Sequence, residues 1–202
     1  MDITLYPYSL AVFLFTIALS LYVMYLKNSL YGKLMLIPYA VDQYNEWYRF
    51  ITSGFIHADI MHLGFNMMTF YYFAFRYESI VGGSQFLLVY FGSMIFADVV
   101  TYTKNKKNPR YAALGASGAI SGLLFSFILY DPGMSLYIMF VPIAIPAPVF
   151  AVLYLLYSWY ADKKSQDNIN HNAHLWGALT GIAITILIDF PVLKSFLNYF
   201  FN

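Results

Sequence analysis

The sequence contains no cysteine and very little charge. Because none of its 202 residues is Cys, disulfide bonds and a thiol nucleophile are both excluded. Only 10% of the residues are charged, whereas about 25% are charged in a typical soluble domain. The net charge of +1 at pH 7 provides no electrostatic footprint for a nucleic acid. The chain therefore cannot cover its surface with groups that face water.

What the chain has instead is apolar sequence, since hydrophobic residues make up 60% of it. We predict an all-α membrane protein with a single membrane domain, residues 1–202, whose outer surface meets the lipid bilayer. The 20 tyrosines suit the two membrane interfaces, where an apolar ring and a wet hydroxyl are both satisfied.

Six stretches without Lys, Arg, Asp or Glu come close to the ~20 helical residues that cross a bilayer core of ~30 Å. They predict spans at approximately 5–26, 58–76, 80–101, 116–131, 146–161 and 171–189. The first has neither a basic start nor a small-residue cleavage site, so we expect a retained span rather than a signal peptide. Proline removes a helix donor, so we expect the fifth helix to start near Pro146 and Tyr137–Ile145 to be irregular.

Polar side chains inside these spans are costly in lipid and indicate function. The four histidines form two clusters, His57 with His62 at the second span and His171 with His174 at the sixth. His62 and Asn66 are four residues apart and share one helix face, whereas His57 is expected at the helix entrance.

Small residues mark the starts of the fourth and sixth spans. Gly118 precedes Gly122 by four residues, and Gly177 precedes Gly181 by the same step. Small residues at this spacing let two membrane helices approach closely. We therefore expect the glycine face of the fourth helix to pack against that of the sixth.

This packing predicts a catalytic dyad. Two crossings separate the second span from the fourth and the fourth from the sixth, so all three helices begin on one side of the membrane. There His174 can accept the proton of Ser117 and make its hydroxyl a nucleophile. His62, Asn66 and the backbone N–H of Ser117 are suited to stabilising an oxyanion. No acidic third member is placed to orient His174.

Plainer interpretations stand beside this one. The Gly-Ser steps are usual packing devices in membrane helices, and the histidines and Asn66 could serve only as structural hydrogen-bonding groups or line the path of a small transporter. Whether His171 takes a direct part in the chemistry stays open. Ser121 is expected to be a packing residue. Four histidines could bind zinc, but the chain has no His-Glu-x-x-His, and we expect no carboxylate to lie close by in either cluster. We predict no metal and no cofactor.

At these residues the sequence resembles the rhomboid family of intramembrane serine proteases. The matching patterns are His57-x4-His62-x3-Asn66, Gly115-Ala-Ser117-Gly118 and Ala173-His174-x2-Gly177-x3-Gly181, and Arg49 and Glu78 fall at the family's distances from the first of them. The resemblance covers roughly Tyr44 to Ile188. It implies a six-transmembrane-helix rhomboid-like bundle of the bacterial type, a multi-pass protein of the bacterial inner membrane.

The resemblance also implies roles for these residues. Ser117 resembles the nucleophile and His174 the base, while His62, Asn66 and the Ser117 N–H resemble the oxyanion hole. Structural or supporting roles fall to the remaining matches, which are His57, Arg49, Glu78, Gly115, Gly118, Gly177 and Gly181. The implied activity is hydrolysis of a peptide bond in or near a transmembrane helix of a membrane-protein substrate, without a cofactor. Such a helix must unwind first, because its backbone is otherwise fully hydrogen-bonded.

Two departures from the family pattern leave an alternative open. The family's Trp-Arg pair is here Tyr48-Arg49, with Trp47 one place early. Ser121 stands where the family usually has an aromatic residue, four positions after the nucleophile, that stacks on the catalytic histidine. The orientation of His174 is then less secured, and a catalytically inactive rhomboid-like protein that binds membrane clients is the alternative.

The distribution of basic residues and the family resemblance predict opposite orientations of the chain in the membrane. Nine basic residues fall on the side of the active-site mouth: Lys27, Lys33, Arg49, Lys104, Lys106, Lys107, Arg110, Lys163 and Lys164. The other side has only Arg76 and Lys194. Because cytoplasmic loops are rich in Lys and Arg, this count places the mouth in the cytoplasm, whereas the resemblance places it outside with both termini inside.

Overall fold

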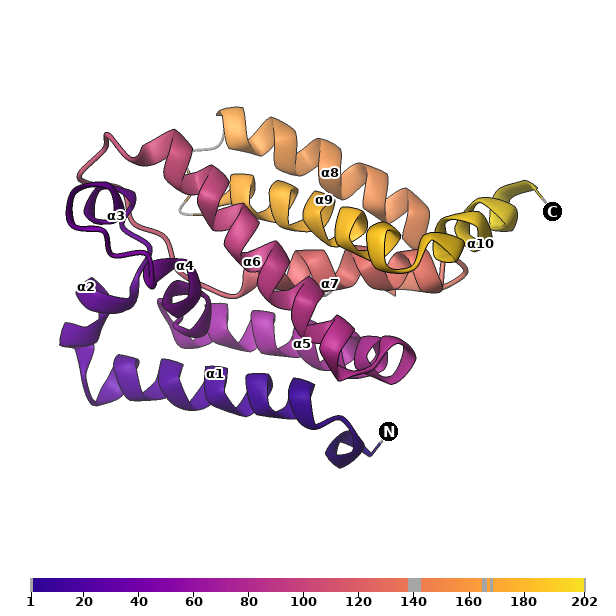
Figure 1. Cartoon of the computed structure of the whole chain (residues 1–202), viewed down its shortest axis with the longest axis horizontal. Coiled ribbons are helices and arrows are strands. Elements are labelled where there is room, and N and C mark those ends of the chain that lie inside the picture. Colours follow the sequence, from indigo (N-terminus) through magenta and orange to yellow (C-terminus); the bar gives the residue numbers. More distant parts are fainter. Residues whose placement is uncertain (1, 138–142, 165–166, 168, 202) are drawn as a thin grey trace.

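The computed structural model describes residues 2–137, 143–164, 167 and 169–201. Its long helices are α1 (Pro7–Tyr25), α5 (Ile60–Val81), α6 (Gly83–Asn105), α7 (Ser117–Tyr130), α8 (Ala147–Lys164) and α9 (His171–Ile188), and they lie side by side in a bundle (Figure 1). Each of the six ranges that the sequence predicted to be helical overlaps one of them, and α5, α6 and α8 extend beyond the predicted C-terminal limits. Over the described residues the architecture is all-α apart from one small strand pair.

Short helices fill the link between α1 and α5. They are η2 (Asn28–Leu30), α2 (Tyr31–Leu34), α3 (Pro38–Tyr44), α4 (Arg49–Thr52) and η3 (Ser53–Phe55), and η1 (Ile3–Leu5) precedes α1. The α2–α4 group gathers at one end of the bundle, and α5, α7 and α9 all begin at that end (Figure 1). The fold thus brings the starts of these three helices together.

Three helices, α1, α6 and α9, are long and apolar enough to cross a membrane by length and composition. Helix α7 is also apolar but has only 14 residues, which corresponds to about 21 Å. That all six long helices cross the bilayer stays a prediction for α5, α7 and α8.

Helix α7 is the centre of the bundle. Every residue from Gly118 to Leu129 is buried, because α5, α6, α8 and α9 all pack on it. Where α7 meets α9, a Cβ atom on Gly177 would overlap the carbonyl oxygen of Gly118, and one on Gly181 would overlap that of Gly122. The predicted contact between the two glycine faces is therefore confirmed.

Helix α1 turns a stripe of small and polar residues towards the bundle. The buried residues are Ser9, Val12, Thr16, Ser20 and Val23. The hydroxyls donate to backbone carbonyls, Ser9 to Ala74 at 3.3 Å and Ser20 to Phe55 at 3.0 Å. A helix in lipid is expected to turn its polar side chains towards the bundle and its apolar side chains towards the bilayer.

Two features of the C-terminal third differ from the sequence prediction. The segment expected to be irregular, Tyr137–Ile145, takes part at both of its ends in a two-stranded antiparallel sheet, β1 (Ser135–Tyr137) with β2 (Ala144–Pro146), which satisfies backbone hydrogen-bonding groups there. Its part at 138–142 lies outside the described residues. A further helix, α10 (Phe190–Phe201), follows α9 and points away from the bundle (Figure 1).

Candidate active site

The chain turns sharply just before Ser117, the first residue of α7. Gly115 has φ +113°, a conformation that favours glycine. Its N–H donates to the Ser53 carbonyl at 2.9 Å, and the next N–H, of Ala116, donates to Nε2 of His57 at 3.4 Å. The turn is thus fastened to the segment that leads into α5.

The start of α7 leaves backbone donors free. Ala116 supplies no side-chain cap, and the N–H groups of Ser117, Gly118 and Ala119 have no acceptor among the residues that the structure describes. Unpaired N–H groups at a helix start carry partial positive charge and are suited to holding an oxyanion.

His62 and Asn66 lie against the same turn. A Cβ atom placed on Gly115 would be 2.8 Å from Nε2 of His62 and 3.7 Å from Nδ2 of Asn66. The Asn66 Nδ2 is buried and has no hydrogen-bond partner in the described part of the chain. A buried unpaired donor costs free energy, so this amide is a candidate contact for a substrate oxygen. The structure brings His62, Asn66 and the start of α7 together.

His57 makes all of its polar contacts inside the fold. Its Nε2 accepts from Ala116, so Nδ1 carries the proton and donates to the Ser20 hydroxyl at 3.0 Å. Its ring lies 4.9 Å from that of His62, edge to face. Burial, and secondarily the neighbouring His62, lowers the pKa of His57 to about 3. The ring therefore stays neutral and keeps this hydrogen-bonding pattern at physiological pH.

His174 lies in the first turn of α9, level with Ser117. The register is set by the close packing of α7 on α9, in which a Cβ atom on Gly118 would be 3.4 Å from the Ala173 carbonyl oxygen. Ser117 and His174 are both half-buried. The structure has no hydrogen bond between the Ser117 hydroxyl and the His174 ring among its described residues. It brings the two residues to the same level of the α7–α9 pair without joining them.

His171, the first residue of α9, has a carboxylate beside it, which corrects the expectation that no carboxylate lies close by in either histidine cluster. His171 Nε2 lies 3.1 Å from both carboxylate oxygens of Asp167, and the His171 ring is 6.0 Å from that of His174. The sequence did not indicate this contact because Asp167 lies before the helix, four residues ahead of His171. The described residues contain no group of three or more His, Cys, Asp or Glu that could hold a metal ion.

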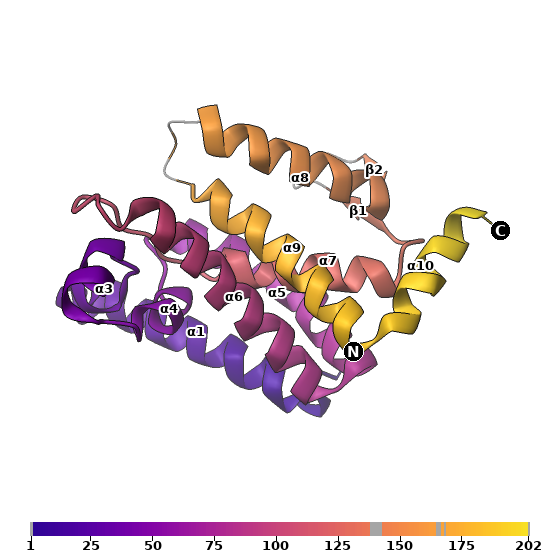
Figure 2. The same ribbon diagram turned by 45° about the horizontal axis from the view of Figure 1, so that its top comes forward.

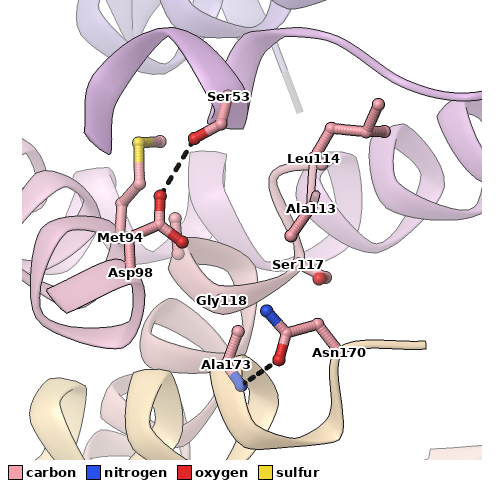
Figure 3. Close-up of a pocket in the computed structure, with 11 residues that line it drawn as sticks. Ser53, Met94, Asp98, Ala113, Leu114, Ser117, Gly118, Asn170 and Ala173 are labelled. Carbon is pink, nitrogen blue, oxygen red and sulfur yellow. Dashed lines mark hydrogen bonds between the residues drawn. The ribbon is translucent and has the colours of Figure 1, made fainter. Parts of the chain in front are cut away.

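A small cavity adjoins Ser117 (Figure 3). Its volume is about 20 Å³, enough for one water molecule. On one wall the Ser53 hydroxyl donates to Asp98 at 2.9 Å, and on another the Asn170 side chain accepts from the Ala173 N–H at 3.1 Å (Figure 3). Sequence reasoning missed these residues, although an Asn directly before a helix is a common N-cap signal.

An aromatic side chain faces His174 although Ser121 stands where the family has one. Tyr154 of α8 stacks on the His174 ring, with centroids 6.3 Å apart and planes 19° from parallel. Its hydroxyl is hydrogen-bonded to the Ser121 hydroxyl at 2.7 Å. Ser121 therefore contacts the stacking residue instead of supplying it.

Arg49 fastens the link between α1 and α5. Its guanidinium donates to the carbonyls of Met35 at 2.6 Å and Gly32 at 3.0 Å, and it forms an ion pair with Glu46 at 2.6 Å. The displaced Trp47 packs on Phe50, with ring centroids 5.9 Å apart. The link between α1 and α5 is therefore anchored even though Tyr48 replaces the family's Trp before Arg49.

Glu78, near the end of α5, contacts the first helix. Its carboxylate accepts from the N–H groups of Tyr8 at 3.3 Å and Ser9 at 2.7 Å. These are two of the donors that a helix start leaves unpaired. Glu78 thus joins the N-terminus of α1 to the end of α5, a partner that the sequence did not indicate.

Comparisons with known proteins identify the family of the chain. The family described as Rhomboid domain matches residues 44–189. "Putative rhomboid protease YdcA" of Bacillus subtilis (strain 168) is 35% identical over 144 residues, 70% of this chain and 67% of that protein. "Rhomboid-like protein 11, chloroplastic" of Arabidopsis thaliana is 30% identical over 162 residues, 76% of this chain and 57% of that protein. "Rhomboid-type serine protease 2" of Emericella nidulans is 29% identical over 153 residues, 71% of this chain and 27% of that protein.

A bundle of apolar helices around a buried central helix is the fold of a multi-pass integral membrane protein. Within that class, the chain belongs to the rhomboid family. It spans about two thirds or less of the length of the relatives named above.

Proposed function

We propose that the protein is an intramembrane serine endopeptidase that cleaves membrane-protein substrates in or near their transmembrane helices. Membership of the rhomboid family and the likeness to proteins named as rhomboid proteases support a hydrolase of this kind. The observation that carries the proposal is the meeting of four features at one helix end. These are the Ser117 hydroxyl, the free N–H groups of α7, the unpaired Asn66 amide and the His174 ring.

In the proposed mechanism, His174 accepts the Ser117 proton while the serine oxygen attacks the scissile carbonyl carbon. The negative charge that develops on the carbonyl oxygen is held by His62, Asn66 and the Ser117 N–H. His174 then donates its proton to the leaving amine, and the acyl-enzyme is hydrolysed by water with the same two residues.

The short α7 gives this chemistry a place inside the bilayer. At about 21 Å it falls short of a hydrocarbon core of ~30 Å, so we infer that Ser117 lies below the membrane surface. The cavity beside Ser117 has room for one water molecule, which hydrolysis needs. A substrate helix must unwind near the scissile bond, so helix-weakening residues are expected there.

Arg49, Glu78 and His57 take supporting roles in this proposal. They fasten the link before α5, the start of α1 and the turn before Ser117 to the bundle. Gly115, Gly118, Gly177 and Gly181 allow the close approaches that bring the reacting groups together.

One observation favours a second candidate, an inactive rhomboid-like protein that binds membrane clients. It is the missing hydrogen bond between Ser117 and His174 in the described part of the chain. Catalytic hydrogen bonds are often long before substrate binds, so this contact is expected to tighten in the protease.

A fluorophosphonate probe separates the two candidates. We expect the purified protein to be labelled at Ser117, to lose labelling in Ser117→Ala, and to keep it in Ser126→Ala. Ser126 is a matched control because it lies buried on the same helix and donates to the Gly122 carbonyl. Co-expression with tagged single-pass substrates should show cleavage by the wild type and not by Ser117→Ala. Equal results for wild type and Ser117→Ala in both assays would refute the protease.

We further propose residence in a bacterial inner membrane with both termini in the cytoplasm, following the family rather than the charge count. Basic residues in long links, such as Lys33 and Arg49, have less weight in the positive-inside rule. A reporter fused to the C-terminus tests the orientation, because a periplasmic signal would contradict it.

A further inference from the structure

Tyr154 connects three helices at the candidate active site. It belongs to α8, its ring is stacked on His174 of α9, and its hydroxyl is bonded to Ser121 of α7. The ring also packs on Phe125 of α7, with centroids 5.3 Å apart. Tyr154 is therefore held from the α7 side while its flat face lies against the histidine.

The His174 ring has little else to fix its orientation. Its side chain makes no hydrogen bond among the described residues, and no carboxylate pairs with it there, since Asp167 pairs with His171. The one other ring contact of His174 in the described chain is the edge of His171, at 6.0 Å. A base without a hydrogen-bonded partner depends on packing for its aim.

Helix α8, which supplies the ring, is held less firmly than its neighbours. It lies at the outer edge of the bundle (Figure 2). Its fully buried residues are only Ala147, Ser158 and Ala161, whereas α7 is buried along almost its whole length. At its far end, Asp162 pairs with Lys104 of α6 at 2.6 Å in a partly exposed contact, of a kind that contributes little stability.

We propose that Tyr154 is the positioning residue for His174, and that the seating of α8 on α7 through the Ser121–Tyr154 hydrogen bond sets the catalytic competence of the dyad. This inference rests on the proposed function. It explains how a chain with Ser121 in place of an aromatic residue keeps a stacked histidine. When α8 leaves α7, the ring leaves His174, so movement of this helix controls the orientation of the base.

The test compares variants of the two hydroxyl partners in the full chain. Tyr154→Leu removes the ring and should slow fluorophosphonate labelling of Ser117 by up to about 100-fold, the effect expected for a misplaced catalytic group. In substrate cleavage, kcat should fall while KM changes little. Tyr154→Phe and Ser121→Ala each remove only the hydrogen bond, so they should slow labelling by similar, smaller factors. Because they remove the same contact, the double variant should be no slower than either alone.

A swap of the two positions provides the rescue. Ser121→Tyr combined with Tyr154→Ala returns an aromatic ring from α7 and should restore labelling relative to Tyr154→Ala. The matched control is Tyr160→Leu, since Tyr160 lies on α8, is 60% exposed and has no ring contact in the described structure. It should label at the wild-type rate.

Histidine NMR supplies a readout that does not need activity. The chain has only four histidines, and the His174 ring signal is identified by its loss in His174→Asn. That signal should move in Tyr154→Leu and stay in place in Tyr160→Leu. A Tyr154→Leu protein with an unmoved His174 signal and wild-type labelling would overturn the inference, as would independent effects of Tyr154→Phe and Ser121→Ala. If the wild type neither labels nor cleaves, the proposed function fails, while the NMR comparison still decides whether Tyr154 orients His174.

Discussion

Replacing Gly177 with alanine tests the helix contact on which the whole site depends. The added methyl carbon would overlap the Gly118 carbonyl oxygen and lie 2.8 Å from its carbon and 2.9 Å from its Cα. These are backbone atoms of a buried helix, so they cannot rotate away as a side chain could. The two helices must move apart at the level of Ser117 and His174.

The expected cost follows from this geometry. Overpacking a tight interior costs about 1–3 kcal/mol, and a rigid backbone neighbour places Gly177→Ala at the upper end. The better helix propensity of alanine returns up to about 1 kcal/mol. We therefore expect a net loss of about 2 kcal/mol in the free energy of unfolding, or about 30-fold in the unfolding equilibrium.

The matched control is the same chemical change at Gly64. A Cβ atom there meets nothing within 4 Å, so Gly64→Ala should be neutral or stabilising by up to about 1 kcal/mol. Unfolding in mixed micelles with increasing SDS measures both variants, and fluorophosphonate labelling reports the dyad. Gly177→Ala should lose stability and labelling together. A Gly177→Ala protein as stable as Gly64→Ala would refute the close α7–α9 contact.

Three further changes test other parts of the site. Gly115→Ala puts a side chain at φ +113° and 2.7 Å from Cε1 of His62, so labelling of Ser117 should fall sharply; unchanged labelling would contradict the placement of that turn. Glu78→Gln removes the charge that caps α1 and should lower the free energy of unfolding by about 1–2 kcal/mol, measured by SDS titration; no change would contradict the cap. The pKa of His57 is lowered by burial to about 3, below the ~6.5 of an unfolded chain. Protonation then favours the unfolded state. The contribution of His57 to the free energy of unfolding should be complete above pH ~6.5 and fall by up to about 1.4 kcal/mol per pH unit as the pH drops towards 3. When the free energy of unfolding is measured at several pH values, its dependence on pH should be weaker in His57→Gln, and an equally steep dependence in that variant would contradict this cause.

The helix positions could be predicted from the sequence because charge is so costly in lipid. Each stretch without Lys, Arg, Asp or Glu overlaps a long helix, although α5, α6 and α8 continue into charged sequence. The matching Gly-xxx-Gly steps predicted which faces of α7 and α9 meet. Helix α10 was missed because Lys194 and Pro191 interrupt its apolar pattern. The β1–β2 pair was missed because prolines signal only where a helix ends, while strand pairing depends on residues that meet across a turn.

The site was predictable where its residues follow one helix and unpredictable where they meet across helices. His62 and Asn66 share a face by their spacing alone, and both lie at the Gly115 turn. Nothing in the spacing says that Glu78 reaches the start of α1, 69 residues away from Ser9. Nor does periodicity say which face of α8 meets α9, because apolar residues surround that helix on all sides.

Ser121 shows why a departure from a motif has to be judged in three dimensions. Along α7 it removes the aromatic residue expected beside the base, which favours an inactive relative. Across the bundle its hydroxyl holds Tyr154 of α8 against His174. Ser117 and His174 thus belong to a helix pair that packs closely through glycines, whereas Tyr154 belongs to α8 at the outer edge of the bundle (Figure 2). Under the proposed function, a substrate that displaces α8 also moves the Tyr154 ring and so changes the orientation of His174. Entry of that substrate and the orientation of the base then depend on the same Tyr154–His174 contact.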